Sequence, residues 1–154
     1  MKKENIIKYG NPILALLLVA VLGTLFTTVE MDWFETLNKP SRWINMALIP
    51  IVWTIIYTLC AFYLVHLTKE NKLHKTLKFY LIINGILNVL WCLVFFTLKN
   101  TLLGLVVIDI NLLSSFFLLK EVFDTNKKWG YVLMIYPTWL TIATCLNLAT
   151  WILN

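Results

Sequence analysis

The chain has 154 residues, of which 60% are hydrophobic and only 14% charged, and its mean hydropathy is +0.78. This balance is too apolar for an ordinary soluble globular domain. The net charge of +5 comes from basic residues dispersed over short segments between apolar runs, which gives no reason to predict nucleic-acid binding.

Five apolar runs follow one another along the chain, and each is long enough to cross a hydrocarbon core of about 30 Å. They cover residues 12–29, 46–67, 79–98, 101–119 and 129–153. We expect the first helix to begin near Asn11 and Pro12, which suit the N-cap and first turn of a helix. The sequence therefore predicts an all-α integral membrane protein whose single domain, residues 1–154, is a bundle of five transmembrane helices in the lipid bilayer.

Only the connection between the first two runs is long. Residues 30–45 mix acidic, basic and aromatic side chains, which suits a segment that lies at the headgroup level or folds over the bundle. The other connections are short, so we expect successive helices to be antiparallel neighbours.

The basic residues predict the orientation of the bundle in the membrane. One side carries Lys2, Lys3, Lys8, Lys69, Lys72, Lys75, Lys78, Lys120, Lys127 and Lys128, whereas the other carries Lys39, Arg42 and Lys99. Basic residues concentrate on the cytoplasmic side of membrane proteins. We therefore expect a cytoplasmic N-terminus and, after five crossings, a C-terminus outside.

The third run carries amides and aromatic rings along one face. Asn84, Asn88, Trp91 and Phe95 stand at i, i+4, i+7 and i+11, which places them on the same side of an α-helix. Because an amide in hydrocarbon needs a hydrogen-bonding partner, we expect this face to point into the bundle. Two interpretations remain open: hydrogen bonds between helices, or the lining of a ligand pocket.

Aromatic residues recur on the second and fifth runs. The second run carries Trp53 and Tyr57 four residues apart, and one broad face of the fifth carries Tyr136, Trp139, Ala143 and Asn147. Rings with a few phenol and amide groups suit a planar, amphipathic ligand, which stacks by its faces and hydrogen-bonds by its edges. Simple helix packing produces the same stripe, so spacing alone leaves both interpretations open.

Asp109 is an acidic residue in the middle of an apolar run, which makes it a candidate for function. The alternative is a structural hydrogen bond to Asn84, Asn88 or Asn111. Neither histidine has cysteines or carboxylates arranged to complete a metal site, so we predict no metal. The sequence also lacks the motifs of nucleotide-binding loops and hydrolases, and we expect neither chemistry.

Four motifs in order and spacing resemble those of a known family. The first loop has Trp-x-x-x-Leu-x-Lys-Pro from Trp33, and the second run has Trp-Thr-x-x-Tyr from Trp53. The third run has Asn-x-x-Trp-x-x-x-Phe-Phe from Asn88, and the fifth has Tyr-x-x-Trp-x-x-x-Ala-Thr-x-Leu-Asn from Tyr136. Over about residues 33–154 the chain is similar to the tryptophan-rich sensory protein (translocator protein, TspO) family.

The chain departs from the family pattern in three places. The Pro-Pro pair that usually follows the Lys-Pro of the first loop is replaced by other residues at 43–45. Ile135 stands where the family has a proline before the helix-five tyrosine, and Ser114 stands where a tryptophan is common. Asp109 matches a position that is commonly Glu or Asp.

The resemblance implies five transmembrane helices, frequent homodimers, and binding of porphyrins such as protoporphyrin IX inside the bundle under the loop at residues 30–45. Sterols and benzodiazepine-type or isoquinoline ligands are further expected ligands, and no obligatory cofactor is implied. Carried over by position, the pocket residues are Phe34, Trp53, Tyr57, Asn88, Trp91, Trp139 and Ala143.

Three functions are compatible with these observations. The first is porphyrin binding for tetrapyrrole sensing, handling or transport. The second is enzymatic, because some bacterial relatives are reported to promote light-dependent porphyrin breakdown; Trp53 and Trp139 would then be the candidate catalytic residues. The third is a sterol- or lipid-binding membrane regulator, for which Leu59, Tyr63 and Lys69 fit a loose recognition pattern.

Overall fold

Five helical segments of the chain are long and apolar enough to cross a membrane, as the sequence predicts. They cover Gly10–Thr28, Leu48–Glu70, Lys75–Thr97, Thr101–Thr125 and Lys127–Leu153. The computed structural model describes residues 3–40, 45 and 47–154, and no strand occurs among them. The predicted all-α class and the five-helix architecture are therefore confirmed.

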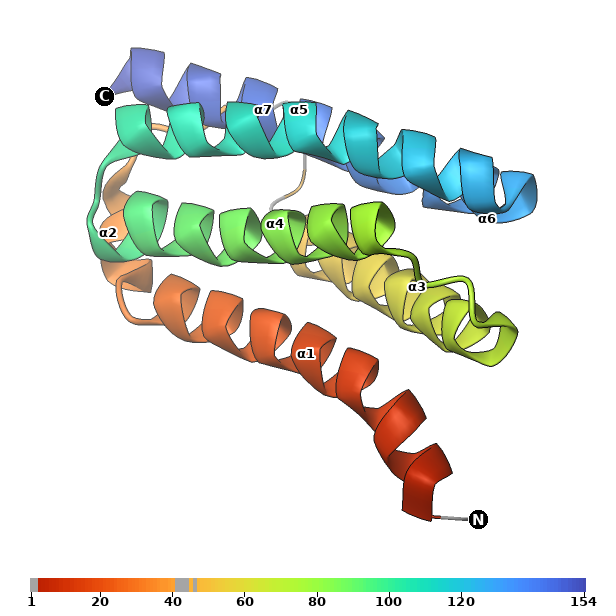
Figure 1. Ribbon diagram of the computed structural model, residues 1–154. Coiled ribbons are helices and arrows are strands. Elements are labelled where there is room, and N and C mark those ends of the chain that lie inside the picture. Colours follow the sequence, from red (N-terminus) through yellow and green to blue (C-terminus); the bar gives the residue numbers. More distant parts are fainter. Residues whose placement is uncertain (1–2, 41–44, 46) are drawn as a thin grey trace.

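Shorter elements interrupt this simple pattern (Figure 1). In chain order the helices are α1 (Lys3–Thr28), α2 (Met31–Thr36), α3 (Leu48–Glu70), α4 (Lys75–Cys92), the π-helical turn η1 (Leu93–Thr97), α5 (Thr101–Thr125), α6 (Lys127–Leu133) and α7 (Ile135–Leu153). The first loop thus contains a helix of its own, and the third span ends in a π turn.

The predicted start of the first helix is wrong. Helix α1 begins at Lys3, and Pro12 lies inside it, not at its first turn. A proline inside a helix removes one backbone hydrogen bond and clashes with the preceding turn, which bends the helix. Figure 1 shows this bend toward the N-terminal end of α1.

The fifth segment is divided at Met134 into α6 and α7. Pro137 follows three residues later and has no N–H to donate to the carbonyl of Leu133. The helical path continues nonetheless, because Met134 N–H donates to the Gly130 carbonyl at 3.1 Å and Thr138 N–H to the Met134 carbonyl at 3.2 Å. The segment therefore crosses as one rod with a local irregularity.

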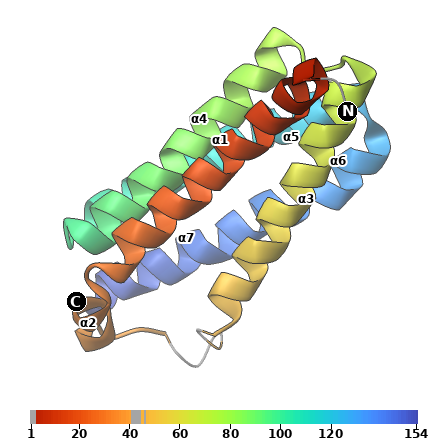
Figure 2. The ribbon, with the colours of Figure 1, turned by 90° about the horizontal axis from the view of Figure 1, so that it is seen from below.

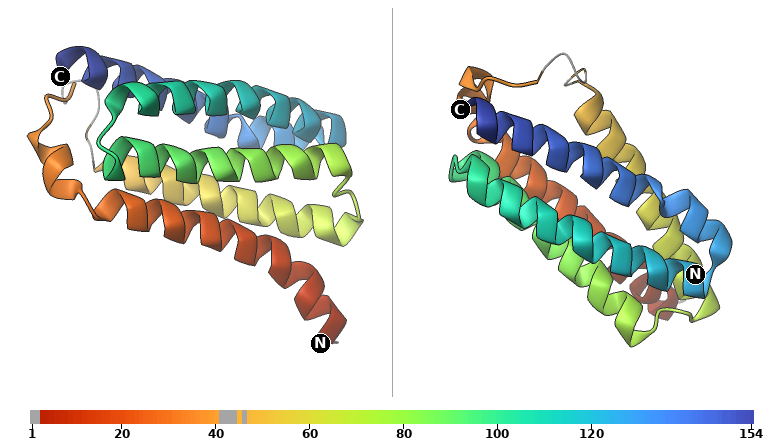
Figure 3. Two further views of the ribbon diagram at one scale, coloured as in Figure 1. Left: turned by 60° about the vertical axis from the view of Figure 1, so that its left-hand side comes forward. Right: turned by 90° about the horizontal axis from the view of Figure 1, so that it is seen from above.

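Helix α5 packs against α4 and α7, while α1 lies along α3 and α4 (Figure 3). Helices α3 and α7 diverge toward the end of the bundle where α2 lies (Figure 2). At that end, α2 lies next to the C-terminal end of α7.

Candidate functional site

Buried asparagines from two helices meet one tyrosine at the centre of the bundle. Asn88 Nδ2 on α4 donates to the Tyr136 hydroxyl at 2.8 Å, and Asn111 Nδ2 on α5 donates to Asn88 Oδ1 at 3.1 Å. The Tyr136 hydroxyl in turn lies 3.1 Å from Asn84 Oδ1 and 3.3 Å from Asn111 Oδ1. Asn84 Nδ2 donates to Ser114 Oγ at 3.0 Å. We call Asn84, Asn88, Asn111, Ser114 and Tyr136 the amide cluster.

The amide cluster confirms that the polar face of the third span points inward. The sequence left two interpretations of these amides open, hydrogen bonds between helices or the lining of a ligand pocket. The structure shows the hydrogen bonds between helices. In hydrocarbon such bonds contribute about 0.6–2 kcal/mol each. The cluster therefore fixes the relative rotation of α4, α5 and α7, and so positions the rings around it.

A second polar connection joins the same three elements closer to α2. Trp91 Nε1 on α4 donates to Asn147 Oδ1 on α7 at 2.9 Å, and Asn147 Nδ2 donates to the Thr101 carbonyl at the start of α5 at 3.0 Å. The Trp91 indole is thus held by its polar edge. Its ring is only partly buried, which leaves some of its surface available for contact.

Helix α3 adds an aromatic pair to the amide cluster. The rings of Trp53 and Tyr57 stack with centroids 5.7 Å apart, and the Trp53 ring meets that of Tyr136 edge to face at 6.4 Å. Tyr136 therefore uses its hydroxyl in the amide cluster and its ring against Trp53. Trp53 and Tyr57 are both partly exposed. The structure thus brings together the predicted residues of α3, α4 and α7.

The π turn η1 carries the contact between the bundle and the first loop. Phe95 stacks on Trp91 at 5.5 Å, while Phe34 of α2 lies 5.2 Å from Phe96 and 6.2 Å from Phe95. A π turn shifts the register of the following side chains, and here it buries both Phe95 and Phe96. The predicted pocket residue Phe34 is therefore part of an aromatic column that leads from α2 to Trp91.

The first loop is fastened to the bundle by its polar groups. Asn154 Oδ1 accepts from the Asn38 N–H at 3.0 Å, and Asn154 Nδ2 donates to the Asn38 carbonyl at 3.0 Å. Glu30 pairs with Lys99 at 2.8 Å. The Lys39 ammonium lies 4.3 Å from the centroid of the Phe34 ring. The predicted covering loop is thus attached through residues 30–39, and its residues 41–44 lie outside the described part of the chain.

Trp139 on α7 is a buried donor without an acceptor. Its side chain is 5% exposed, and among the described residues its Nε1–H has no hydrogen-bond partner. Trp139 belongs to the buried core cluster, and the partly buried Trp53, Trp91 and Ala143 pack against that cluster. A buried donor left unpaired costs about 1–3 kcal/mol. Such a group is stabilised when a ligand supplies the missing acceptor.

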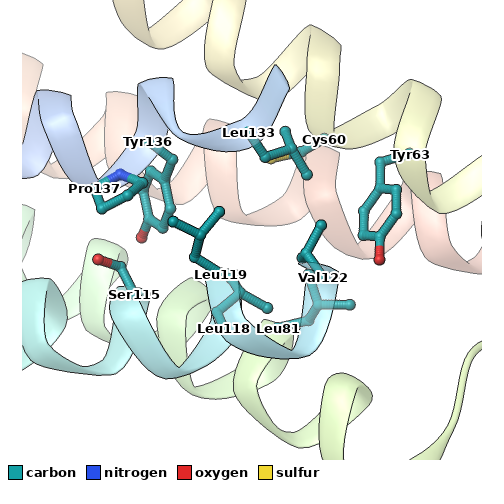
Figure 4. Close-up of a pocket in the computed structure, with 10 residues that line it drawn as sticks. All are labelled: Cys60, Tyr63, Leu81, Ser115, Leu118, Leu119, Val122, Leu133, Tyr136 and Pro137. Atoms are coloured by element: carbon teal, nitrogen blue, oxygen red, sulfur yellow. The ribbon is translucent and has the colours of Figure 1, made fainter. Parts of the chain in front are cut away.

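A small cavity lies on the other side of the amide cluster (Figure 4). Its volume is about 20 Å³, and Tyr136 and Ser115 stand at one end of it and Tyr63 at the other. This is room for about one water molecule. A planar ligand of several rings therefore does not fit in this cavity.

Asp109 is the one candidate that the structure places elsewhere. It was predicted as a functional residue or as a hydrogen-bonding partner of nearby asparagines, and its side chain is exposed on α5. Asn111 and Asp109 are two residues apart, about 200° around a helix, and cannot both face inward. Burial of Asn111 in the amide cluster therefore turns Asp109 outward. The hydrogen bonds expected between Asp109 and Asn84, Asn88 or Asn111 are not among those of the described residues.

Two residues that contribute to the site, Ser114 and Asn154, were not among the residues predicted from the sequence. Ser114 was noted only as a departure from the family pattern, yet it accepts from Asn84; its position three residues after Asn111 is a signal that places it on the inward face of α5. Asn154 joins the first loop to α7. No local pattern links residues that lie so far apart in sequence.

Comparison with known proteins gives one consistent result. The model of the TspO/MBR family matches residues 12–152. The tryptophan-rich protein TspO of Archaeoglobus fulgidus is 32% identical over 154 residues, which cover 97% of this chain and 99% of that protein. A protein of the same name from Chlorobaculum tepidum is 31% identical over 145 residues, 90% of each chain. The tryptophan-rich sensory protein of Cereibacter sphaeroides is 28% identical over 127 residues, 80% of this chain and 77% of the relative.

Proposed function

The chain belongs to the TspO/MBR family, and from that premise we propose that it binds a porphyrin of the protoporphyrin IX type between α3, α4 and α7, for tetrapyrrole sensing, handling or transport. The protein is a multi-pass integral membrane protein with five spans. A sensory role is supported by the name of the relative from Cereibacter sphaeroides, a tryptophan-rich sensory protein.

The observation that carries the proposal is the unpaired Trp139 indole within an aromatic environment. A porphyrin offers two flat apolar faces and acceptor atoms at its centre and its carboxylate side chains. Its faces would stack on partly exposed rings such as Trp53 and Trp91, and one acceptor would pair with Trp139 Nε1–H. Binding would thus satisfy a donor that the bundle leaves without a partner among its described residues.

Entry of such a ligand requires the covering loop to open. The Asn38–Asn154 and Glu30–Lys99 contacts hold the loop against η1 and the end of α7. Each is a small interaction at an exposed or half-buried place. Opening also separates Phe34 from Phe95 and Phe96, but none of these residues belongs to the buried amide cluster. We therefore place the entrance at the α2 end of the bundle, where α3 and α7 diverge (Figure 2).

The test is a titration of protoporphyrin IX into the purified detergent-solubilised protein, followed by tryptophan emission and the Soret band in the dark. Saturable quenching is expected. Loss of the Trp139 hydrogen bond, about 0.5–1.5 kcal/mol, together with the smaller ring at position 53, about 0.5–1.5 kcal/mol, should weaken binding about 5- to 150-fold in Trp53→Phe with Trp139→Phe. Trp129→Phe is the matched control, because Trp129 packs on Tyr63 and His66, outside the proposed site. An unchanged affinity in the double variant would remove Trp53 and Trp139 from the site.

The same titration separates the remaining functions. Under light and oxygen, a bound porphyrin produces oxidants next to electron-rich indoles, so bleaching of the Soret band that depends on Trp53 and Trp139 would support photo-oxidative degradation. Quenching without bleaching would support a sensor or carrier. Absence of saturable porphyrin binding would favour the sterol- or lipid-binding regulator instead.

We further propose that the N-terminus is cytoplasmic and the C-terminus outside. Basic side chains near the junction of α5 and α6, Lys120, Lys127 and Lys128, lie at the opposite end of the bundle from Lys39 and Lys99, as the positive-inside rule requires. Labelling of a single cysteine at Asn154 by a membrane-impermeant reagent, applied from outside intact cells, would support this orientation; labelling only after the cells are opened would reverse it.

A further inference from the structure

One lysine of the first loop is withdrawn from water. Among the lysines whose side chains the structure describes, Lys39 is partly buried and all the others are exposed. Its ammonium lies 4.3 Å from the centroid of the Phe34 ring and donates to the Phe34 carbonyl. Pro40 favours an extended backbone at Lys39, and the Asn154 side chain binds both the N–H and the carbonyl of the preceding Asn38. The loop therefore positions this cation.

The Lys39 ammonium lacks a carboxylate partner. It takes part in none of the ion pairs between described residues. The other lysine at this end of the bundle, Lys99, is paired with Glu30 at 2.8 Å. The remaining acids of the first loop, Asp32 and Glu35, are exposed. A neutral carbonyl and a ring face are weaker partners for an ammonium than a carboxylate is, so Lys39 is able to bind an anion.

Aromatic contacts connect Lys39 with the proposed porphyrin site. Its ring partner Phe34 lies 6.2 Å from Phe95, which stacks on Trp91 at 5.5 Å. Two ring contacts thus join the ring under the ammonium to an indole of the site that is partly exposed. Lys39 follows α2 in the chain, and α2 lies at the end of the bundle where we place the entrance (Figure 2). The cation therefore stands at the entrance to the site.

The charge distribution of a protoporphyrin suits such an entrance. Both of its carboxylates extend from one edge of the ring, and the rest of its rim is apolar. In a membrane protein the charged edge is most stable near water and a cation, with the apolar edge inside the bundle. The lysine stem is flexible, so the ammonium can exchange the Phe34 carbonyl for a carboxylate while its apolar stem stays in place.

We propose that Lys39 selects ligands that carry carboxylates, by pairing with the acidic edge of the porphyrin at the entrance. This inference rests on the proposed porphyrin site between α3, α4 and α7. It adds the class of tetrapyrrole, an acidic one, and the direction in which it lies: acidic edge toward the first loop, apolar edge toward the amide cluster. A neutral ester of the same ring fits the aromatic residues equally well but offers Lys39 no charge.

The test compares protoporphyrin IX with its dimethyl ester, titrated in the dark into the protein in a non-ionic detergent free of anionic lipid. No lipid phosphate then competes for Lys39. The measured quantity is the ratio of the two dissociation constants, because detergent takes up each porphyrin to the same extent whichever variant is present. Lys39→Gln, whose amide still donates to the Phe34 carbonyl, should lower the preference for the acid about 3- to 30-fold, the worth of a partly buried charge pair.

Two further variants separate the charge of Lys39 from its place in the loop. Lys99→Gln removes a cation from the same end of the bundle and should keep the wild-type ratio, because Lys99 is already paired with Glu30. Lys39→Arg keeps the charge and should restore most of the preference for the acid. A purely structural role of Lys39 in the loop would change both affinities together and leave their ratio as it is. Thermal unfolding followed by circular dichroism checks that each variant folds.

The outcomes distinguish this inference from the function on which it rests. If both porphyrins bind and Lys39→Gln keeps the wild-type ratio, selection by Lys39 is refuted and the porphyrin site stands. An equal loss of preference in Lys99→Gln would also overturn the inference, because the effect would then belong to the general charge of this end. Failure of both porphyrins to bind the wild type would overturn the proposed function, and this inference with it.

Discussion

Removal of the Tyr136 hydroxyl tests whether the amide cluster holds the bundle together. In Tyr136→Phe the Asn88 amide loses its acceptor at 2.8 Å. The Tyr136 hydroxyl also donates its one proton, which lies between two acceptors, Asn84 Oδ1 at 3.1 Å and Asn111 Oδ1 at 3.3 Å from the hydroxyl oxygen, and this donor is lost as well. At most two hydrogen bonds therefore disappear at once. At about 0.6–1.7 kcal/mol each in a membrane, the free energy of unfolding should fall by about 1–3 kcal/mol.

Reversible unfolding in mixed micelles, followed by circular dichroism and tryptophan fluorescence, measures this loss. Tyr131→Phe is the matched control, because Tyr131 is 70% exposed. The phenylalanine at position 136 keeps the ring that packs on Trp53, so porphyrin affinity should change less than stability. If the two variants unfold within about 0.5 kcal/mol of each other, the spread of an ordinary surface substitution, the amide cluster does not stabilise the bundle as argued.

Three further predictions address the loop, the pH response and the packing. Asn154→Ala breaks both side-chain hydrogen bonds to Asn38 and should speed proteolytic cleavage of the first loop, with the free energy of unfolding lowered by at most about 1 kcal/mol; an unchanged cleavage rate would contradict the attachment. The hydrogen bond to Glu121 raises the pKa of His74 above 6.5, so this contact stabilises the fold below about pH 6.5 and its contribution is lost as pH rises through the raised pKa. An NMR titration should show the pKa of His74 lowered in Glu121→Gln, and an unchanged value would exclude the contact. Gly104→Ala places a Cβ 2.9 Å from a buried phenylalanine ring and should destabilise the bundle by about 1–3 kcal/mol; a thermal midpoint at or above that of the wild type would show that the ring yields freely.

The amide-bearing face of the third span illustrates what could be predicted locally. Asn84, Asn88 and Trp91 recur at helical spacing within an apolar run, and an amide that faces lipid is costly whatever the rest of the fold. Their inward orientation therefore follows from the sequence. Their partners, Ser114, Tyr136 and Asn147, come from other helices, and the pairing depends on how α5 and α7 are rotated.

Asp109 shows the limit of the same reasoning. Read alone, an acid in an apolar run is expected to face the bundle. Its helix also carries Asn111 and Ser115, and the two faces compete for the interior. The rotation that buries Asn111 and Ser115 turns Asp109 outward, and this choice becomes visible only when the whole cluster is assembled.

The sequence by itself determined the five spans, the all-α class and the family, because span length, apolar composition and motif spacing are local properties that the bilayer selects. Tertiary structure alone decided which amides pair, that a π turn buries both Phe95 and Phe96, and that Asn38 is attached to Asn154. These features depend on the relative rotation and depth of helices far apart in the chain. In a bundle without a hydrophobic driving force between its helices, that rotation is set by side-chain packing and a few hydrogen bonds, and no single segment contains them.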